Sequence, residues 1–183
     1  GGLPGVPREL QNLEATYGAS VLRDTNFKRD DLKEQLTSAD YSIVHIATHG
    51  HFDSNPQESY LLTYDDKLTM DLLEESIGNR KNVGEPLELL VLSACETAAG
   101  DSRAALGLAG VALKAGARSA VATLWQISDA ATVEIIDTFY EYTAKEGVTK
   151  ARAMQLAQIR LIEQPRFQHP TDWAPFLMIG NWL

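Results

Sequence analysis

Short apolar runs alternate with amphipathic stretches along the whole chain. Three runs are apolar at almost every position and predict strands over residues 41–48, 87–94 and 117–125. Continuous apolar runs of this length are typical of strands that a parallel sheet covers on both faces. Shorter apolar stretches predict a small strand at 19–23 and an edge strand within 173–183.

Helices are expected where apolar residues recur every three or four positions. Residues 10–17 form one such stretch, and Gly18 is suited to end it. Asp129 and Thr149 are the expected N-caps of two later helices. The predicted helices therefore cover residues 10–17, 30–36, 71–77, 104–116, 129–145 and 149–163.

The alternation of strands and helices predicts an α/β sandwich with a mostly parallel central sheet flanked by helices. The length of 183 residues suits a single domain. A possible hairpin lies between two of these elements, at residues 60–70, with its turn at Asp65 and Asp66. The glycines and prolines of residues 1–7 are typical of a domain boundary, so we expect residues 1–183 to be one domain of a longer protein.

Charge and cysteine content exclude several classes of function. The formal net charge is −9, whereas a protein that binds nucleic acid directly needs a basic face. A single cysteine excludes an internal disulfide framework and a cysteine-type zinc site, and it suits a reducing compartment. The chain contains neither an apolar run of about 18 residues nor a signal-peptide pattern, so we expect no membrane association and a cytoplasmic location.

The candidate chemistry lies at the ends of two predicted strands. His49 follows the strand at 41–48, and Cys95 follows the strand at 87–94. In open parallel sheets, ligands and catalytic groups gather beyond the carboxyl ends of the strands. A histidine near a cysteine there can stabilise a thiolate nucleophile. Taken alone, however, a cysteine such as Cys95 is more often a small buried apolar residue than a nucleophile.

A metal site is a second interpretation of the same region. His49, His51 and Asp53 form a His-x-His-x-Asp pattern, which is half of a dizinc hydrolase signature. The full signature continues with a histidine, where this chain has Ser54. His45 lies about 13 Å from His49 along an extended strand, too far to join the same ion. We therefore favour His51 as an exposed loop residue and His45 as a hydrogen-bonded core histidine, and we expect no metal.

Four segments together resemble the successive landmarks of the CHAT domain family. They are "YSIVHIATHGHFD", "LELLVLSACETAAGD", "GLAGVALKAGARSAVATLWQISDAAT" and "HPTDWAPFLMIGNW", in that order along the chain. The likeness extends from about Leu3 to Leu183. The family is similar to caspases and separases, and its members are often fused to tetratricopeptide repeats or sensor modules.

The resemblance implies a caspase-like three-layer sandwich and a cysteine endopeptidase that needs no cofactor. His49 matches the catalytic histidine of the family and Cys95 its nucleophile. The implied reaction is peptide-bond hydrolysis through an acyl-enzyme, with the oxyanion held by the backbone N–H groups of Gly50 and Cys95. The implied partners are a protein or peptide substrate and a fused or associated regulatory domain, either a tetratricopeptide repeat or a sensor.

Substrate preference depends on the residues around the nucleophile. Strand periodicity puts Ser93 on the same face as Cys95, and in related proteases that position lines the pocket for the residue before the cut. Ser93 is neutral, which removes the simplest support for a Lys or Arg preference. Asp53, Asp101 and Asp129 follow predicted strands and are further substrate-binding candidates.

Two further expectations differ from that of an enzyme that is active on its own. Members of the family usually have at least one more strand before the "LPG" that lies near the start of this chain, so we expect the first strand of the domain to be missing. The alternative function is a catalytically silent or conditionally inactive CHAT-like module that binds a partner protein.

Overall fold

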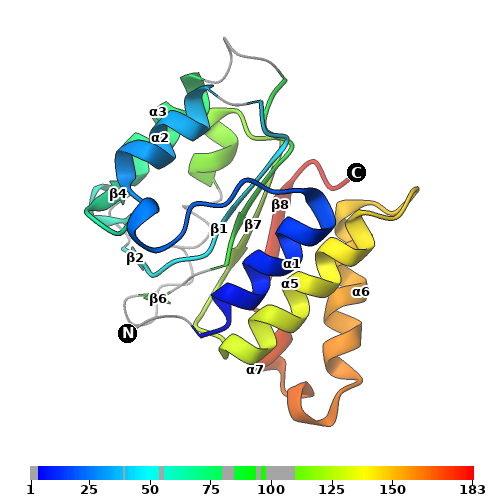
Figure 1. Ribbon diagram of the computed structural model, residues 1–183. Helices are drawn as coiled ribbons and strands as arrows, with labels where there is room; N and C mark the ends of the chain where they lie inside the picture. The colour runs from blue at the N-terminus through cyan, green and yellow to red at the C-terminus, as the bar shows by residue number, and fades with distance from the viewer. Residues whose placement is uncertain (1–3, 39, 54–55, 80–84, 94–95, 98–109) are drawn as a thin grey trace. The chain divides into compact units, whose positions relative to one another are not determined.

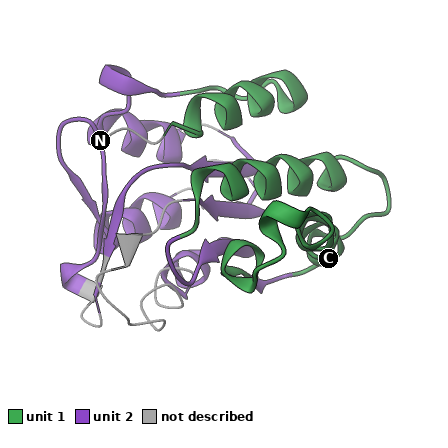
Figure 2. Ribbon diagram, turned by 90° about the horizontal axis from the view of Figure 1, so that it is seen from below, with its two compact units in different colours: residues 1–21, 127–178, 182–183 green, residues 22–126, 179–181 purple. Residues whose placement is uncertain are grey.

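A computed structural model describes residues 4–38, 40–53, 56–79, 85–93, 96–97 and 110–183 (Figure 1). The chain divides into two compact units, which Figure 2 colours separately. The first unit comprises Gly1–Val21, Ile127–Met178 and Trp182–Leu183. The second comprises Leu22–Gln126 and Ile179–Asn181.

The larger strands form a four-stranded sheet in the order β1-β5-β7-β8. These strands are β1 (Ile43–Ile46), β5 (Leu89–Leu92), β7 (Ser119–Thr123) and β8 (Phe176–Gly180). β1 pairs with β5, and β5 pairs with β7, in both cases in parallel. The sheet confirms the predicted α/β class, and β8 is at its edge as the sequence pattern indicates.

Burial differs between the strands according to their position in the sheet. Every residue of β5 and β7 is buried, as the continuous apolar runs predict. In β1 only Ile46 is buried, because this strand lies at the other edge of the sheet. The prediction of a strand covered on both faces was therefore wrong for residues 41–48. The predicted strand at 19–23 was also wrong, since these residues belong to no regular element.

One face of this sheet carries the core of the second unit. Helices α2 (Arg29–Ser38) and α3 (Met70–Asn79) lie on that face, together with the helical residues 110–115 (Figure 1). Their apolar side chains form one buried cluster with those of the strands, including Leu36, Leu73, Ala112, Ile46, Leu90, Leu92 and Ala122. The helices predicted over 30–36 and 71–77 are confirmed.

A second, smaller sheet has the strand order β4-β3-β2-β6. Its strands are β2 (Gly50–Phe52), β3 (Tyr60–Leu62), β4 (Lys67–Thr69) and β6 (Glu96–Thr97), and the short turn η2 (Pro56–Glu58) precedes β3. β3 and β4 form the predicted hairpin, which is antiparallel and closed by a hydrogen bond from Thr63 N–H to the Asp66 carbonyl, 2.9 Å.

The tip of this hairpin is attached to the start of α2. The Asp65 carboxylate accepts a hydrogen bond from the Arg29 backbone N–H at 3.0 Å, and the Arg29 guanidinium pairs with Asp66. The Arg29 N–H is the main reason that the pKa of Asp65 lies below its ordinary value. Asp65 therefore also caps the start of a helix, and Asp66 pairs with the side chain of the same residue, roles that the local sequence does not reveal.

The first unit consists mainly of helices with clear ends. α1 (Val6–Tyr17) ends at Gly18, which has a left-handed backbone with φ 63°, as predicted. α6 (Lys150–Ile162) starts at the predicted N-cap Thr149, whose hydroxyl accepts a hydrogen bond from Arg152 N–H. α5 (Asp129–Thr143) is capped by Ser128 instead of Asp129, which is its first helical residue.

The remaining elements complete the first unit. They are η4 (Pro165–Phe167) and the four-residue helix α7 (Pro170–Trp173). The short turn η1 (Asp24–Asn26) belongs to the second unit. The buried face of α5 includes Ile135, Ile136 and Phe139. Among the described helices, none has both the length and the apolar composition needed to cross a bilayer.

Candidate functional site

Two neighbouring strands of the large sheet both continue into the small sheet. The pairing of β1 with β5 ends with a hydrogen bond from Ser93 N–H to the Ile46 carbonyl, 3.1 Å. The chain that leaves β1 then enters β2, and the chain that leaves β5 enters β6. β2 and β6 pair in parallel, with His51 opposite Glu96 and Phe52 opposite Thr97. The two chain segments that leave β1 and β5 are therefore paired with each other twice, once where the strands end and again in the small sheet.

His49 lies in the connection between β1 and β2 and is half-buried. Its carbonyl accepts a hydrogen bond from Leu62 N–H at 2.8 Å. The hydroxyl of Thr48 donates to the carbonyl of the same residue, Leu62, at 2.6 Å. The backbone around the predicted base is thus held by the hairpin strand β3.

Ser93 follows β5 and is buried, with 8% of its surface exposed. Its Oγ lies 3.1 Å from Nε2 of His45, which projects from the neighbouring strand β1. This contact confirms His45 as a hydrogen-bonded histidine, although it is half-buried rather than fully buried. The group next to the Ser93 hydroxyl is therefore an imidazole.

Gly50 and Asp53 frame the short strand β2. Gly50 is buried and pairs with Leu61 of β3. The Asp53 backbone N–H donates to the Ser59 hydroxyl at 2.9 Å, and this hydroxyl lies 3.3 Å from the Asp53 carbonyl. Ser59 therefore closes the turn that follows β2, and the half-buried Asp53 is anchored there by its backbone.

The sequence-predicted site residues are divided between the described parts of the chain. His49, Gly50, Asp53 and Ser93 belong to the second unit, whereas Asp129 starts α5 in the first. Cys95 and Asp101 lie outside the described residues. The backbone pairing above relates the segment of His49 to the residues that flank Cys95.

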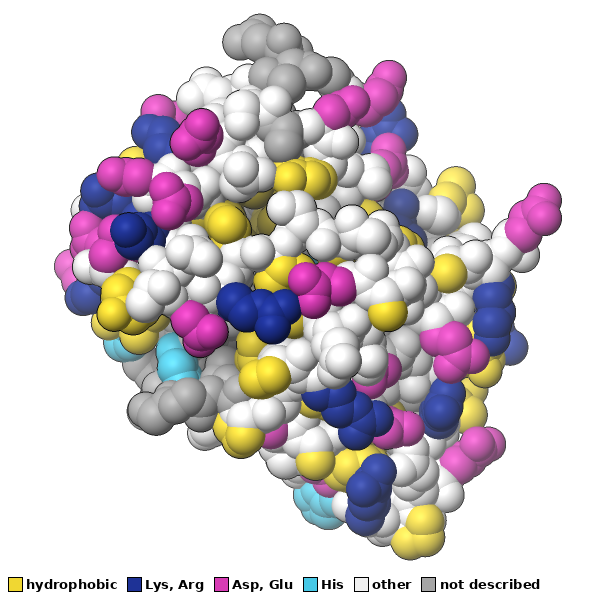
Figure 3. Space-filling view, viewed as in Figure 1, with side chains coloured by type: hydrophobic (Ala, Val, Ile, Leu, Met, Phe, Trp, Pro, Cys, Tyr) yellow, Lys and Arg dark blue, Asp and Glu magenta, His cyan; other side chains and the backbone are white. Residues whose placement is uncertain are grey.

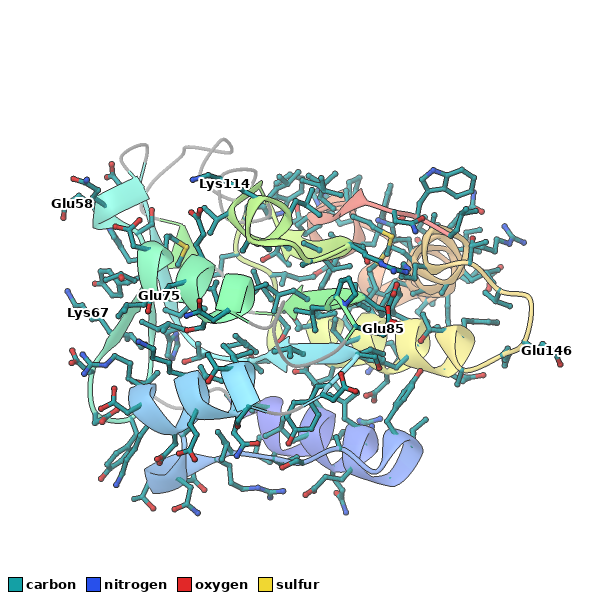
Figure 4. The ribbon with its side chains drawn as sticks, turned by 90° about the horizontal axis from the view of Figure 1, so that it is seen from above. Glu58, Lys67, Glu75, Glu85, Lys114 and Glu146 are labelled. Carbon is teal, nitrogen blue, oxygen red and sulfur yellow. The ribbon has the colours of Figure 1, made fainter. Side chains whose placement is uncertain are left out.

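His51 differs from its prediction as an exposed loop residue. It is half-buried in β2, and its ring stacks on Tyr60 with the ring centres 5.4 Å apart and an interplanar angle of 30°. Lys67, which projects from β4 (Figure 4), puts its ammonium 3.9 Å from the centre of the Tyr60 ring. The sequence does not predict this stack of His51, Tyr60 and Lys67, because the three residues come together only through the register of the strands.

A shared metal site needs several side chains that converge on one point. Within the described ranges, which include His49, His51 and Asp53, no three His, Cys, Asp or Glu side chains lie close enough to hold one metal ion. His51 is instead engaged with Tyr60.

Charges on the described surface are largely mixed. Acidic and basic side chains are interspersed on the face that Figure 3 shows. In the second unit, Lys33 pairs with Glu75 at 3.4 Å and Lys114 with Glu74 at 2.9 Å. The bond to Glu74 raises the pKa of Lys114 above its ordinary value. Glu74 and Glu75 of α3 thus form surface ion pairs with two other segments of the second unit.

Comparison with known proteins assigns this arrangement to a family. The CHAT domain family profile matches residues 1–181. The chain belongs to the CHAT domain family. This CHAT domain is also 28% identical, over 131 residues, to Tetratricopeptide repeat protein 28 of Homo sapiens. That match covers 70% of this chain and 5% of the human protein, so the chain spans a small part of this relative. CHAT domains are related to caspase-like cysteine peptidases.

Proposed function

We propose that this CHAT domain is a cysteine endopeptidase in which His49 and Cys95 form the catalytic dyad. The family relation supplies the reaction class, and the described backbone supplies the main structural support. The supporting observation is the parallel pairing of β2 with β6, which sets His51 opposite Glu96. Glu96 is covalently bonded to Cys95, and His51 is two residues after His49.

Covalent geometry limits how far the thiol can be from the base. On one side of Cys95, Ser93 is hydrogen-bonded to Ile46 of β1, and on the other side Glu96 is paired with β2. Consecutive Cα atoms are only about 3.8 Å apart, so the dyad requires that the described residues Ser93 and Glu96 lie beside the segment that carries His49, and both are paired with it or with β1. This double anchoring supports a dyad made from two strand ends.

The proposed reaction is acyl transfer through Cys95. The thiol proton passes to His49, and the thiolate sulfur attacks the carbonyl carbon of the scissile peptide bond. The tetrahedral intermediate collapses as the C–N bond breaks, and His49 gives its proton to the leaving amine. Water then attacks the carbonyl carbon of the thioester, and His49 accepts a proton from this water. The C–S bond breaks, the carboxylic acid leaves, and His49 returns its proton to the sulfur to restore the thiol.

The ladder geometry supports an oxyanion role for the Gly50 N–H. Leu62 N–H donates to the His49 carbonyl, and hydrogen-bonded pairs alternate with non-bonded pairs in an antiparallel ladder. Gly50, paired with Leu61, is next along this ladder, so its N–H is directed away from β3. β6 pairs with the other side of β2, which is the side of the Cys95 segment. We propose that the N–H groups of Gly50 and Cys95 hold the oxyanion.

Ser93 is the proposed floor of the pocket for the residue before the cut, with Asp53 and Asp129 as further substrate-binding candidates. The Ser93 hydroxyl lies 3.1 Å from the His45 imidazole, so a neutral residue and a histidine are the groups that this part of the proposed pocket offers. The proposed substrate is a protein or peptide. A fused or associated regulatory domain is proposed as the control element, in line with the tetratricopeptide repeats named for the human relative. The single cysteine suits a proposed cytoplasmic location.

The single cysteine makes the dyad directly testable. Iodoacetamide can alkylate only one thiol in this chain, so the rate of alkylation against pH reports the pKa of Cys95. We expect the wild type to react at pH 6, and His49→Ala to react there at least about tenfold more slowly. His51→Ala is the matched control, because it removes a neighbouring imidazole that faces Tyr60, and it should react like the wild type.

Turnover is tested with a peptide-based acylating probe that carries a mixed first position. Labelling of wild type that is lost in Cys95→Ala and falls sharply in His49→Ala would support the peptidase. An ordinary thiol pKa, unchanged by His49→Ala, together with no labelling would contradict it. That result would favour the partner-binding module.

A further inference from the structure

One residue of the hairpin, Leu62, is hydrogen-bonded both to the backbone of the proposed base and to the side chain that precedes it. The Leu62 N–H donates to the His49 carbonyl at 2.8 Å, and the Leu62 carbonyl accepts from the Thr48 hydroxyl at 2.6 Å. The first contact continues the β2–β3 ladder by one residue beyond β2. The second uses a side chain, so it depends on the identity of residue 48 and not only on the backbone.

We propose that Thr48 is a positioning residue for His49, acting through Leu62, in the peptidase reaction proposed above. This inference rests on that proposed function and adds a residue to it. Thr48 contacts the Leu62 carbonyl through its hydroxyl. Its hydroxyl closes a hydrogen-bonded ring that fixes the peptide between Thr48 and His49 against β3.

The position of Thr48 in the chain explains why this restraint is needed. The parallel pairing of β1 with β5 ends at Ile46, and the pairing of β2 begins at Gly50. Residues 47–49 cross from one sheet to the other and belong to no strand. A general base on such a connection needs another restraint, because a misplacement of about 1 Å can lower the rate of a reaction about 100-fold.

The hairpin is suited to act as the fixed support. Leu61 of β3 and Leu68 of β4 have 1% and 0% of their surface exposed, and both belong to the core cluster of the second unit. At its tip, the Asp65 carboxylate accepts the Arg29 N–H at the start of α2. The hairpin is thus anchored at its strands and at its turn, and Leu62 transmits this anchoring to residues 48 and 49.

Thr48→Val is the decisive variant because it keeps the shape of the side chain and removes only the hydroxyl. Leu62 is 39% exposed, so water can replace the lost donor and the fold should persist. Thr48→Ser restores the hydroxyl and tests rescue. Thr63→Val is the matched control, because Thr63 is the next residue along the hairpin and its hydroxyl donates to the Asp66 carbonyl at 2.7 Å, away from His49.

The first measurement is the rate of Cys95 acylation by the peptide probe, separated into the maximal rate and the half-saturating concentration. We expect Thr48→Val to lower the maximal rate by about 10- to 100-fold with little change in half-saturation. We expect Thr48→Ser to recover at least about a third of the wild-type rate, and Thr63→Val to match the wild type. A wild-type rate in Thr48→Val, or an equal loss in Thr63→Val, would overturn the positioning role.

The second measurement is the hydrogen exchange of the Leu62 amide, which reports the restraint without any reaction. The amide should be protected in the wild type and in Thr63→Val, and it should exchange faster in Thr48→Val. An unprotected Leu62 amide in the wild type would overturn the inference. His49→Ala separates the two proposals: if it labels as fast as the wild type, the dyad fails and the role of Thr48 fails with it. If His49→Ala is slow and Thr48→Val is fast, only the role of Thr48 fails.

Discussion

Ser93 Oγ lies 3.1 Å from His45 Nε2, across two adjacent parallel strands. The contact links the residue two positions before Cys95 to the edge strand that leads to His49. It also determines the polarity beneath the proposed substrate pocket, since an imidazole and a hydroxyl meet there.

Removal of this hydrogen bond should destabilise the second unit. We expect Ser93→Ala to lower the free energy of unfolding by about 1 kcal/mol, because Ser93 is buried and the bond is lost. Urea denaturation measures the loss. A double-mutant cycle with His45→Ala should give a coupling energy of about 1 kcal/mol, and strictly additive effects would contradict a direct bond.

A carboxylate at position 93 should change the substrate preference. Ser93→Asp would put a negative charge beneath the proposed pocket, so probes with Lys or Arg before the cut should gain at least about tenfold over neutral probes. Ser93→Asn is the control of similar size without a charge, and it should keep the wild-type ranking. Equal rankings for all three proteins would show that Ser93 does not line the pocket.

Gly180 should tolerate a side chain much less well than Gly147. Its φ is +100°, and a Cβ would overlap the Arg118 carbonyl and the Leu113 side chain. We expect Gly180→Ala to cost about 2–4 kcal/mol in thermal or urea unfolding. Gly147→Ala is the matched control, since Gly147 has φ +76° but open space around it. It should cost only about 1 kcal/mol, and equal costs would contradict the steric argument.

Two carboxylates of the first unit should respond to pH with opposite signs. Partial burial is the main cause that raises the pKa of Asp137 above its ordinary 3.8. The native state then binds this proton more tightly than the unfolded chain, so stability falls as the pH rises from 3.8 through the raised native pKa. We expect Asp137→Asn to gain stability relative to the wild type across that range.

Glu141 is the matched opposite case. Hydrogen bonds from Lys145 and Arg160 lower its pKa below the ordinary 4.5. The stability that ionised Glu141 contributes is present above pH 4.5 and is lost as the pH falls through the lowered native pKa. Glu141→Gln should therefore lose stability relative to the wild type as the pH rises from about 3 to 6. The difference in unfolding free energy between variant and wild type should therefore rise with pH for Asp137→Asn and fall with pH for Glu141→Gln. A change in the same direction for both variants would contradict this assignment.

Local sequence pattern is sufficient for the elements whose signals are local. The apolar runs at 87–94 and 117–125 contain β5 and β7, and Gly18 and Thr149 mark helix ends because a left-handed cap or an N-cap hydroxyl acts within one turn. The hairpin at 60–70 follows for the same reason. Ser128 and Asp129 show the limit of such signals: both residue types cap helices, and the backbone conformation makes Ser128 the cap.

Pairing between distant segments cannot be inferred from periodicity. The apolar run of β1 suggests a central strand, yet β1 lies at an edge, because strand order depends on which segments pack together. The register that sets His51 opposite Glu96 and stacks it on Tyr60 has the same origin. The sequence by itself therefore predicts the α/β class, which the sheet confirms, and it is also the source of the proposal that His49 and Cys95 form the dyad. The long-range backbone hydrogen bonds determine which strand supports His49, since they form only when separate segments share one sheet.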